Sequence, residues 1–214
     1  MISWDFDLLQ RINREWTSPF LDYLMPALSA IDAWIPFLAI IVIIAAIRGG
    51  KRARLMLLCI AVAVGLADGV VCKSLKSAVG RVRPRDSMSG VMIRDLAPGK
   101  PAIVRLFKTP MSKVSTEPKD KDARGNSFPS SHVANMFALA TVVALFFRGW
   151  GMVAFVVAAL VAYSRIYVGA HWPSDIPPSA GIGMLVGWGT VRIAGAITKR
   201  WAKGQNDETR MTNE

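Results

Sequence analysis

The sequence predicts an all-α membrane protein, a polytopic bundle of about six transmembrane helices with a long polar loop between the third and fourth. Apolar residues make up 52% of the 214 residues and charged residues only 19%, whereas soluble domains carry about 25% charged residues. Long uncharged apolar runs separate the charged residues. These runs are too continuous for the alternating pattern of a membrane β-barrel, so we expect helices, whose backbone hydrogen bonds are internal.

Six apolar segments approach the roughly 20 residues that a helix needs to cross a bilayer. In chain order they are residues 16–31, 33–47, 55–72, 130–147, 149–164 and 176–198. The first is the weakest, because Pro19, Asp22 and Pro26 interrupt it. In the last, Gly183 and Gly187 stand four residues apart, a spacing that favours close helix packing inside the bundle.

One predicted domain spans residues 1–214 and has polar segments at both ends. Residues 1–14 interleave apolar and polar side chains, which predicts a short amphipathic helix that lies on the membrane surface or packs against the rest of the protein. Residues 199–214 are polar, and we expect a frayed tail. Cys59 and Cys72 are too few for a disulfide framework and are expected to be buried thiols.

The longest connection is a polar loop over residues 73–128. Within it, residues 73–126 contain 13 basic and five acidic residues, a net charge of +8. Loops of this length without clear structure are usually functional or mobile, and we expect this one to belong to an active site. Lys73, Arg81 and Arg85 are interpreted as loop or lipid-headgroup charges.

The basic residues of the other connections predict the orientation in the membrane. In a six-helix order they fall on one side, which collects Arg11, Arg14, the 48–54 turn, Arg148, Lys199, Arg200 and Lys203. Positive charge in short loops favours the cytoplasm. We therefore place this side in the cytoplasm and the long polar loop outside.

Three polar clusters stand at the ends of the predicted helices on the opposite side. They are K-S-A-V-G-R-V-R-P at 76–84, P-S-S-H at 129–132, and S-R-I-Y-V-G-A-H-W-P-S-D at 164–175. In an up-and-down order, the third helix ends, the fourth begins, the fifth ends and the sixth begins on the same face. The three clusters are therefore expected to converge on one membrane face.

The residue types in these clusters suit a phosphate group. Lys76, Arg83 and Arg165 supply positive charge, and guanidinium groups match phosphate oxygens in bidentate geometry. Ser130 and Ser131 open the fourth predicted helix, whose free N–H groups and dipole favour an anion. Three cations and a helix N-terminus suit the charge that develops during phosphoryl transfer. No cluster of carboxylates accompanies them, so we expect a mechanism that uses no metal or other cofactor.

The chain contains only two histidines, His132 and His171, and an imidazole titrates near neutrality in water. Two imidazoles suit double displacement, in which one attacks phosphorus and the other protonates the leaving oxygen. Asp175 follows His171 by four residues. We expect its carboxylate to hold that imidazole in one tautomer and to stabilise the imidazolium.

At these residues the sequence resembles the type 2 phosphatidic acid phosphatases, whose pattern is K-x6-R-P, then P-S-G-H, then S-R-x5-H-x3-D. Residues 76–84 match the first part of the pattern fully, and residues 164–175 match the third. Residues 129–132 depart once, because Ser131 stands where glycine is usual. The six-helix plan extends the resemblance over most of the chain.

The resemblance implies a role for each site residue. His171 would be the nucleophile that forms a phosphohistidine, Asp175 would orient it, and His132 would protonate the leaving group. The residues that would hold the phosphate are Lys76, Arg83, Ser130, Ser131 and Arg165. Members of this family are typically independent of metal ions.

The resemblance also implies a lipid phosphate or diphosphate as substrate, and membrane lipids as the other partners. Bacterial relatives include undecaprenyl diphosphatases, phosphatidylglycerophosphatases and lipid A phosphatases. We expect hydrolysis of undecaprenyl diphosphate to undecaprenyl phosphate, with phosphatidylglycerophosphate, phosphatidic acid and lipid A as alternative substrates. A phosphotransferase, and an anion or lipid transporter with a basic vestibule, are alternatives of other kinds. The expected location is the bacterial inner membrane, with the active site on the extracytoplasmic face and no nucleic-acid partner.

Overall fold

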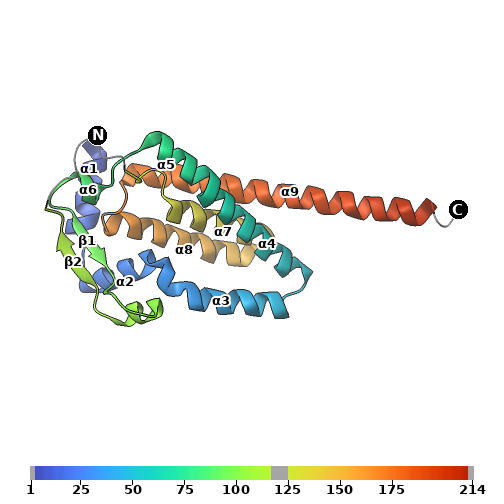
Figure 1. Ribbon diagram of the computed structural model, residues 1–214, viewed down its shortest axis with the longest axis horizontal. Coiled ribbons are helices and arrows are strands. Elements are labelled where there is room, and N and C mark those ends of the chain that lie inside the picture. Colours follow the sequence, from blue (N-terminus) through green and yellow to red (C-terminus); the bar gives the residue numbers. More distant parts are fainter. Residues whose placement is uncertain (1–2, 117–124, 212–214) are drawn as a thin grey trace.

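The computed structural model describes residues 3–116 and 125–211, which form a bundle of long helices with short elements gathered at one end (Figure 1). In chain order the elements are α1 (Ser3–Gln10), η1 (Arg11–Glu15), α2 (Pro19–Ser29), α3 (Ile31–Arg48), α4 (Lys51–Leu66), η2 (Ala67–Cys72), α5 (Lys73–Val79), α6 (Pro84–Ser87), β1 (Met92–Asp95), η3 (Ala102–Phe107), β2 (Met111–Val114), α7 (Ser131–Phe146), α8 (Arg148–Tyr167), η4 (Pro173–Asp175) and α9 (Ile176–Met211). The predicted all-α membrane bundle is confirmed.

Helix α7 is the centre of the bundle and packs against α4, α8 and α9. All four run along the long axis of the molecule, and α3 lies at the edge (Figure 1). Most side chains of α3 are exposed and apolar, including Ile40, Ile41 and Ile47. A helix that presents apolar side chains outward suits contact with lipid chains.

The predicted count of six spans is not confirmed. Among the described residues, four helical stretches are long and apolar enough to cross a membrane, within Ile31–Arg48, Lys51–Ser87, Arg148–Tyr167 and Pro173–Lys199. Helix α7 is apolar but has only 16 residues. The weakest predicted span, residues 16–31, contains α2. The 11 residues of this helix extend only about 16 Å at 1.5 Å per residue. Ser18 caps its start, with Pro19 in the first turn, and the helix ends at Ser29.

The N-terminal segment packs against the rest of the protein. Leu9 and Ile12 are buried in a cluster with Met25, Val91 and Tyr167. Because α2 does not cross the bundle, α1 and η1 lie at the end opposite the α3–α4 turn (Figure 1). The prediction that Arg11 and Arg14 share a side with that turn is therefore wrong.

The predicted 73–128 loop contains more structure than its composition indicates. The helix of α4 continues through η2 and α5 to Val79. Strands β1 and β2 then pair antiparallel, with Met92 opposite Val114 and Asp95 opposite Met111. Apolar residues inside this segment provide its own small core, since Val91, Leu96 and Leu106 are buried.

Helix α9 has 36 residues and continues to Met211, where a frayed tail was expected. Near its start, Gly183 and Gly187 face α7 so closely that an added Cβ would stand 2.2 Å from the Ala134 carbonyl oxygen and 2.7 Å from that of Ala138. The two glycines therefore mediate packing inside the bundle, as predicted. Both cysteines are buried free thiols.

Candidate active site

The three predicted clusters meet at the end of the bundle that carries α1 and the β1–β2 sheet. His132, the second residue of α7, lies within electrostatic range of His171 and of the cations Lys76, Arg83 and Arg165. Helix α5, the segment before α6, helix α8 and the α8–α9 connection contribute these residues. The fold therefore brings together two imidazoles and three positive charges that are far apart in the sequence.

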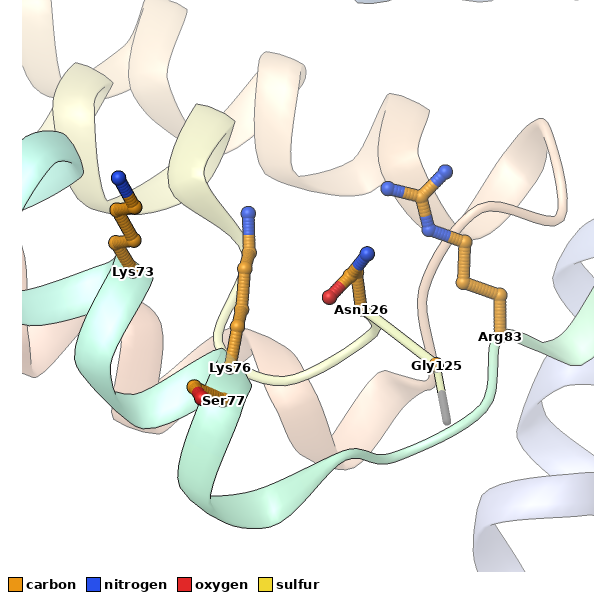
Figure 2. Close-up of a pocket in the computed structure, with 6 residues that line it drawn as sticks. All are labelled: Lys73, Lys76, Ser77, Arg83, Gly125 and Asn126. Carbon is orange, nitrogen blue, oxygen red and sulfur yellow. The ribbon is translucent and has the colours of Figure 1, made fainter. Parts of the chain in front are cut away.

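An open cavity of about 440 Å³ lies beside the first cluster and is lined by Lys73, Lys76, Ser77, Arg83, Gly125 and Asn126. Figure 2 shows the side chains of Lys73, Lys76 and Arg83 pointing to the same side of the backbone. Lys73, which we had interpreted as a loop or headgroup charge, therefore lines the same cavity as two predicted phosphate ligands. The cavity has the charge and the access that a phosphate-bearing molecule needs.

The His171 side chain is buried, and a backbone carbonyl determines its tautomer. Its Nδ1 lies 2.6 Å from the carbonyl oxygen of Ser127. A carbonyl oxygen accepts hydrogen bonds and cannot donate them, so Nδ1 carries the hydrogen and Nε2 carries the free lone pair. Gly169 begins the turn to this residue with a φ of +72°, and an added Cβ there would stand 2.7 Å from Val91 Cγ1.

Asp175 lies near His171, at a separation that suits an ion pair better than a short hydrogen bond. The distance from Asp175 Oδ2 to His171 Nδ1 is 3.7 Å. That oxygen instead accepts hydrogen bonds from Ser127 Oγ at 2.5 Å and from the Trp172 amide at 3.0 Å. Two groups therefore share the role that was expected of Asp175 alone. The Ser127 carbonyl selects the tautomer, and the Asp175 carboxylate supplies negative charge nearby.

Burial lowers the pKa of His171 from 6.5 to about 4, and the positive charge of Arg165 acts in the same direction. The Asp175 carboxylate opposes both by favouring the protonated ring. Burial dominates, because taking a charged imidazolium out of water is costly. The imidazole is therefore neutral at pH 7, which is the form a nucleophile requires.

The predicted phosphate ligands Ser130 and Ser131, at the start of α7, differ in which of their hydrogen-bonding groups are already occupied. Lys76 Nζ donates to Ser131 Oγ at 2.6 Å. The Ser130 amide donates to Ser179 Oγ at 2.8 Å and is therefore occupied within the protein. The first intrahelical donor is Ala134, which bonds the Ser130 carbonyl at 2.9 Å. The amides of residues 131–133 therefore precede the helical ladder, and they are the groups of this helix that an anion could reach.

Two further groups at the site have unused hydrogen-bonding capacity. Within the described part of the chain, the buried atoms Ser130 Oγ and Arg165 Nε have no hydrogen-bond partner. Arg165 Nη1 is anchored to Ser29 at the end of α2, to both its hydroxyl and its carbonyl oxygen. A buried polar atom without a partner is costly in a native fold unless a ligand satisfies it.

Sequence reasoning missed several residues that surround Asp175. Arg81, interpreted as a loop or headgroup charge, instead forms ion pairs with Asp175 and with Asp5 of α1. Ser127 reaches the site because Ser127 N donates to the Arg81 carbonyl at 2.8 Å. Gly125 permits this approach, since an added Cβ there would stand 2.3 Å from the Val82 Cα. Arg81 was inside a cluster already singled out, but no spacing in the sequence pointed to Asp5 or Ser127.

Comparison with known proteins agrees with the geometry. Residues 52–199 match the PAP2 superfamily. The lipid A 4'-phosphatase of Bacteroides thetaiotaomicron is 30% identical over 186 residues, which is 86% of this chain and 74% of that protein. The undecaprenyl-diphosphatase of Bacillus subtilis is 39% identical over 66 residues, 29% of this chain and 32% of that protein.

A solved structure extends the likeness to the whole fold. The crystal structure of Aquifex aeolicus LpxE superposes with a TM-score of 0.65 at 22% identity, covering 89% of this chain and 96% of that chain. The match to the superfamily covers more than half of the sequence, and the described helices include stretches that can cross a membrane. The chain therefore belongs to the PAP2 superfamily and is an integral-membrane lipid phosphatase.

Proposed function

We propose that this protein hydrolyses a phosphate ester or anhydride of a membrane lipid through a phosphohistidine intermediate. His171 Nε2 attacks phosphorus, and the bond from phosphorus to the lipid oxygen breaks. The imidazolium form of His132 donates a proton to that oxygen. Burial and the nearby cations lower the pKa of His132 to about 3 in the free protein, and the negative charge of a bound phosphate opposes this shift by favouring the protonated ring. Water then attacks the phosphohistidine, returns a proton to His132 and releases inorganic phosphate. The observation that supports this proposal best is the 2.6 Å contact between His171 Nδ1 and the Ser127 carbonyl, because it leaves Nε2 as the nucleophilic nitrogen.

The positive charges around the imidazoles have a defined part in this reaction. Lys76, Arg83 and Arg165 offset the negative charge of the phosphoryl oxygens as the transition state forms. The Ser130 hydroxyl and the amides of residues 131–133 add neutral donors. The ligands assigned to phosphate are cations and hydrogen-bond donors, so the proposed reaction proceeds with metal chelators present.

For the substrate we propose a phosphorylated glycolipid of the lipid A type. The support is the extent of the similarity to the Bacteroides phosphatase, which covers 86% of the chain and so includes more than the phosphate-binding motifs. Undecaprenyl diphosphate, the substrate that the family resemblance led us to expect, is the second candidate. Its support is the 440 Å³ cavity, which extends from Lys76 and Arg83 to Lys73 and Asn126 and offers a cation for a second phosphoryl group.

For the location we propose the inner membrane of a bacterium, with the active site facing away from the cytoplasm. The support is the basic α3–α4 turn, where Arg48, Lys51, Arg52 and Arg54 gather at the end of the bundle opposite the site. Positive charge in short connections marks the cytoplasmic side.

The proposal is tested with purified protein in detergent micelles. Phosphate release is measured from lipid A, undecaprenyl diphosphate and phosphatidylglycerophosphate, each with and without EDTA. We expect the highest kcat/KM with lipid A and equal rates in EDTA. Quenching during turnover of a ³²P-labelled substrate should leave label on the wild-type protein and none on His171→Ala. Unchanged turnover in His171→Ala contradicts the nucleophile assignment.

The same experiment separates the other classes of function. A transporter has no reason to retain covalent phosphate, so labelled protein excludes it. A phosphotransferase would move the label to an added acceptor alcohol, whereas a hydrolase releases it as inorganic phosphate.

A further inference from the structure

Two buried carboxylates from distant parts of the chain share one guanidinium group beside His171. The side chains of Asp5 and Asp175 are both 0% exposed. Arg81 Nη2 lies 2.6 Å from Asp5 Oδ2, and Arg81 Nη1 lies 2.5 Å from Asp175 Oδ1. Burying an unpaired charge is costly, and this arginine supplies a positive charge to both carboxylates.

Ser174 closes a ring of hydrogen bonds between the same residues. Its amide donates to Asp5 Oδ1 at 2.8 Å, and its hydroxyl donates to Asp5 Oδ2 at 2.7 Å. That hydroxyl accepts from Arg81 Nη1 at 2.8 Å. Helix α1 is thereby attached to the residue directly before Asp175, and Asp5 holds the guanidinium in place.

The two oxygens of Asp175 face different partners. Oδ2 is the oxygen nearest to His171, at 3.7 Å from Nδ1, and it accepts from Ser127 Oγ and the Trp172 amide. Oδ1 is bonded to Arg81. The guanidinium carbon of Arg81 also lies 5.4 Å from the centre of the Trp172 ring. Arg81 therefore acts on the orientation and charge of Asp175 from the side away from the imidazole.

We infer that Arg81, anchored by Asp5, is a positioning residue that keeps Asp175 ionised and oriented beside His171 during phosphoryl transfer. This inference rests on the proposed function, because Arg81 takes no direct part in the proposed reaction and acts through Asp175. Without Arg81, the buried Asp175 carboxylate loses an adjacent cation, which disfavours its ionised form. A neutral Asp175 stabilises less of the positive charge that develops on the His171 ring as it attacks phosphorus.

The decisive test is a double-mutant cycle on kcat. We expect Arg81→Ala to lower kcat by roughly 10–100-fold, the size of effect that outer-shell partners have on activity, and to leave KM within about threefold. In an Asp175→Asn background, adding Arg81→Ala should lower kcat by less than about threefold, because the two residues act as a unit. If the kcat losses of the two single variants multiply in the double variant, the inference is overturned. A selective rise in KM also overturns it, because that result would place Arg81 on the phosphate.

A matched control exists at the same end of the molecule. Arg105 pairs with Asp32, whose side chain is 54% exposed, and an exposed pair contributes little. We expect Arg105→Ala to leave kcat within about twofold of the wild type. If Arg81→Ala does not elute as a folded species, Asp5→Asn and Arg81→Lys replace it. Both retain side-chain volume, and both should lower kcat at unchanged KM; wild-type kcat in both overturns the inference.

The two proposals fail in different ways. A wild-type protein that releases phosphate from none of the three lipids overturns the proposed function and this inference with it. An active wild type that acquires ³²P on His171, together with an Arg81→Ala variant of unchanged kcat, overturns the role of Arg81 alone.

Discussion

Lys76 Nζ lies 2.6 Å from Ser131 Oγ, so the one residue that departs from the family pattern contacts a residue that matches it. A glycine at position 131 has no hydroxyl to offer. The ammonium group carries three donors, and two remain for a phosphate. Ser131 therefore fixes the position of the Lys76 charge at the N-terminus of α7.

Replacing this serine tests whether the hydroxyl positions Lys76 for binding. We expect Ser131→Gly and Ser131→Ala to raise KM by about fivefold, the equivalent of one hydrogen bond worth about 1 kcal/mol. Because the bond does not depend on the transition state, kcat should stay within about twofold. Steady-state kinetics on the preferred lipid measure both constants. The alanine variant separates the loss of the hydroxyl from any backbone effect of glycine, and a fall in KM contradicts the idea.

The chain has two histidines, which makes the protonation state of His171 directly observable. In ¹⁵N-histidine-labelled His132→Asn, NMR should show one ring with its hydrogen on Nδ1 and a titration midpoint of about 4. Burial lowers the pKa of His171 below its value of 6.5 in an unfolded chain. Its contribution to stability is therefore complete above pH 6.5 and is lost as the pH falls towards 4. A midpoint near 6.5, or a hydrogen on Nε2, contradicts the role of the Ser127 carbonyl.

His132 and His171 should respond differently to the chemistry of the leaving group. We expect His132→Ala to lower kcat by about 10²–10⁴-fold on a lipid phosphate, because the leaving oxygen loses its proton donor. An activated aryl phosphate, whose leaving group needs no proton, should restore most of that rate. His171→Ala should stay inactive on both substrates, since it lacks the nucleophile. Equal rescue of the two variants would show that the roles are misassigned.

The packing of α9 on α7 predicts a difference between two glycines of one helix. A Cβ at Gly183 would stand 2.2 Å from the Ala134 carbonyl oxygen, whereas a Cβ at Gly189 meets nothing within 4 Å. We expect Gly183→Ala to destabilise the protein by about 1–3 kcal/mol, because the neighbouring atoms belong to backbone. Gly189→Ala should be neutral or slightly stabilising. Thermal unfolding in detergent compares them, and equal Tm values contradict the close packing.

The motif residues could be assigned from the sequence because their spacing along the chain is preserved by local structure. Lys76 lies in the last turn of α5 and Arg83 follows the short connection after it, while His171 and Asp175 belong to the connection between α8 and α9. The convergence of the clusters also followed from helix order alone. Because α2 is a short helix that does not cross the bundle, the chain makes one crossing fewer before it reaches all three clusters. The three clusters therefore still lie on the same side as one another.

The features that the sequence left open depended on how the chain folds as a whole. Whether residues 16–31 form one long span depended on where α2 ends, and the helix stops at Ser29 after 11 residues. The hydrogen-bond partner of the Ser130 amide is Ser179, which lies 49 residues later. Apolar periodicity reports which face of a helix is buried, but it does not name the partner of a polar group.

By itself the sequence determined the class of the protein and the chemical groups of its site, because hydrophobic length and residue type act locally. It did not determine how those groups are held. The tautomer of His171, the charge of Asp175 and the burial of Asp5 beside Arg81 arise where the N-terminal helix, the segment around residue 81 and the residues near 127 meet. Hydrogen bonds and ion pairs have ranges of a few ångströms, so only the tertiary structure decides which of them form.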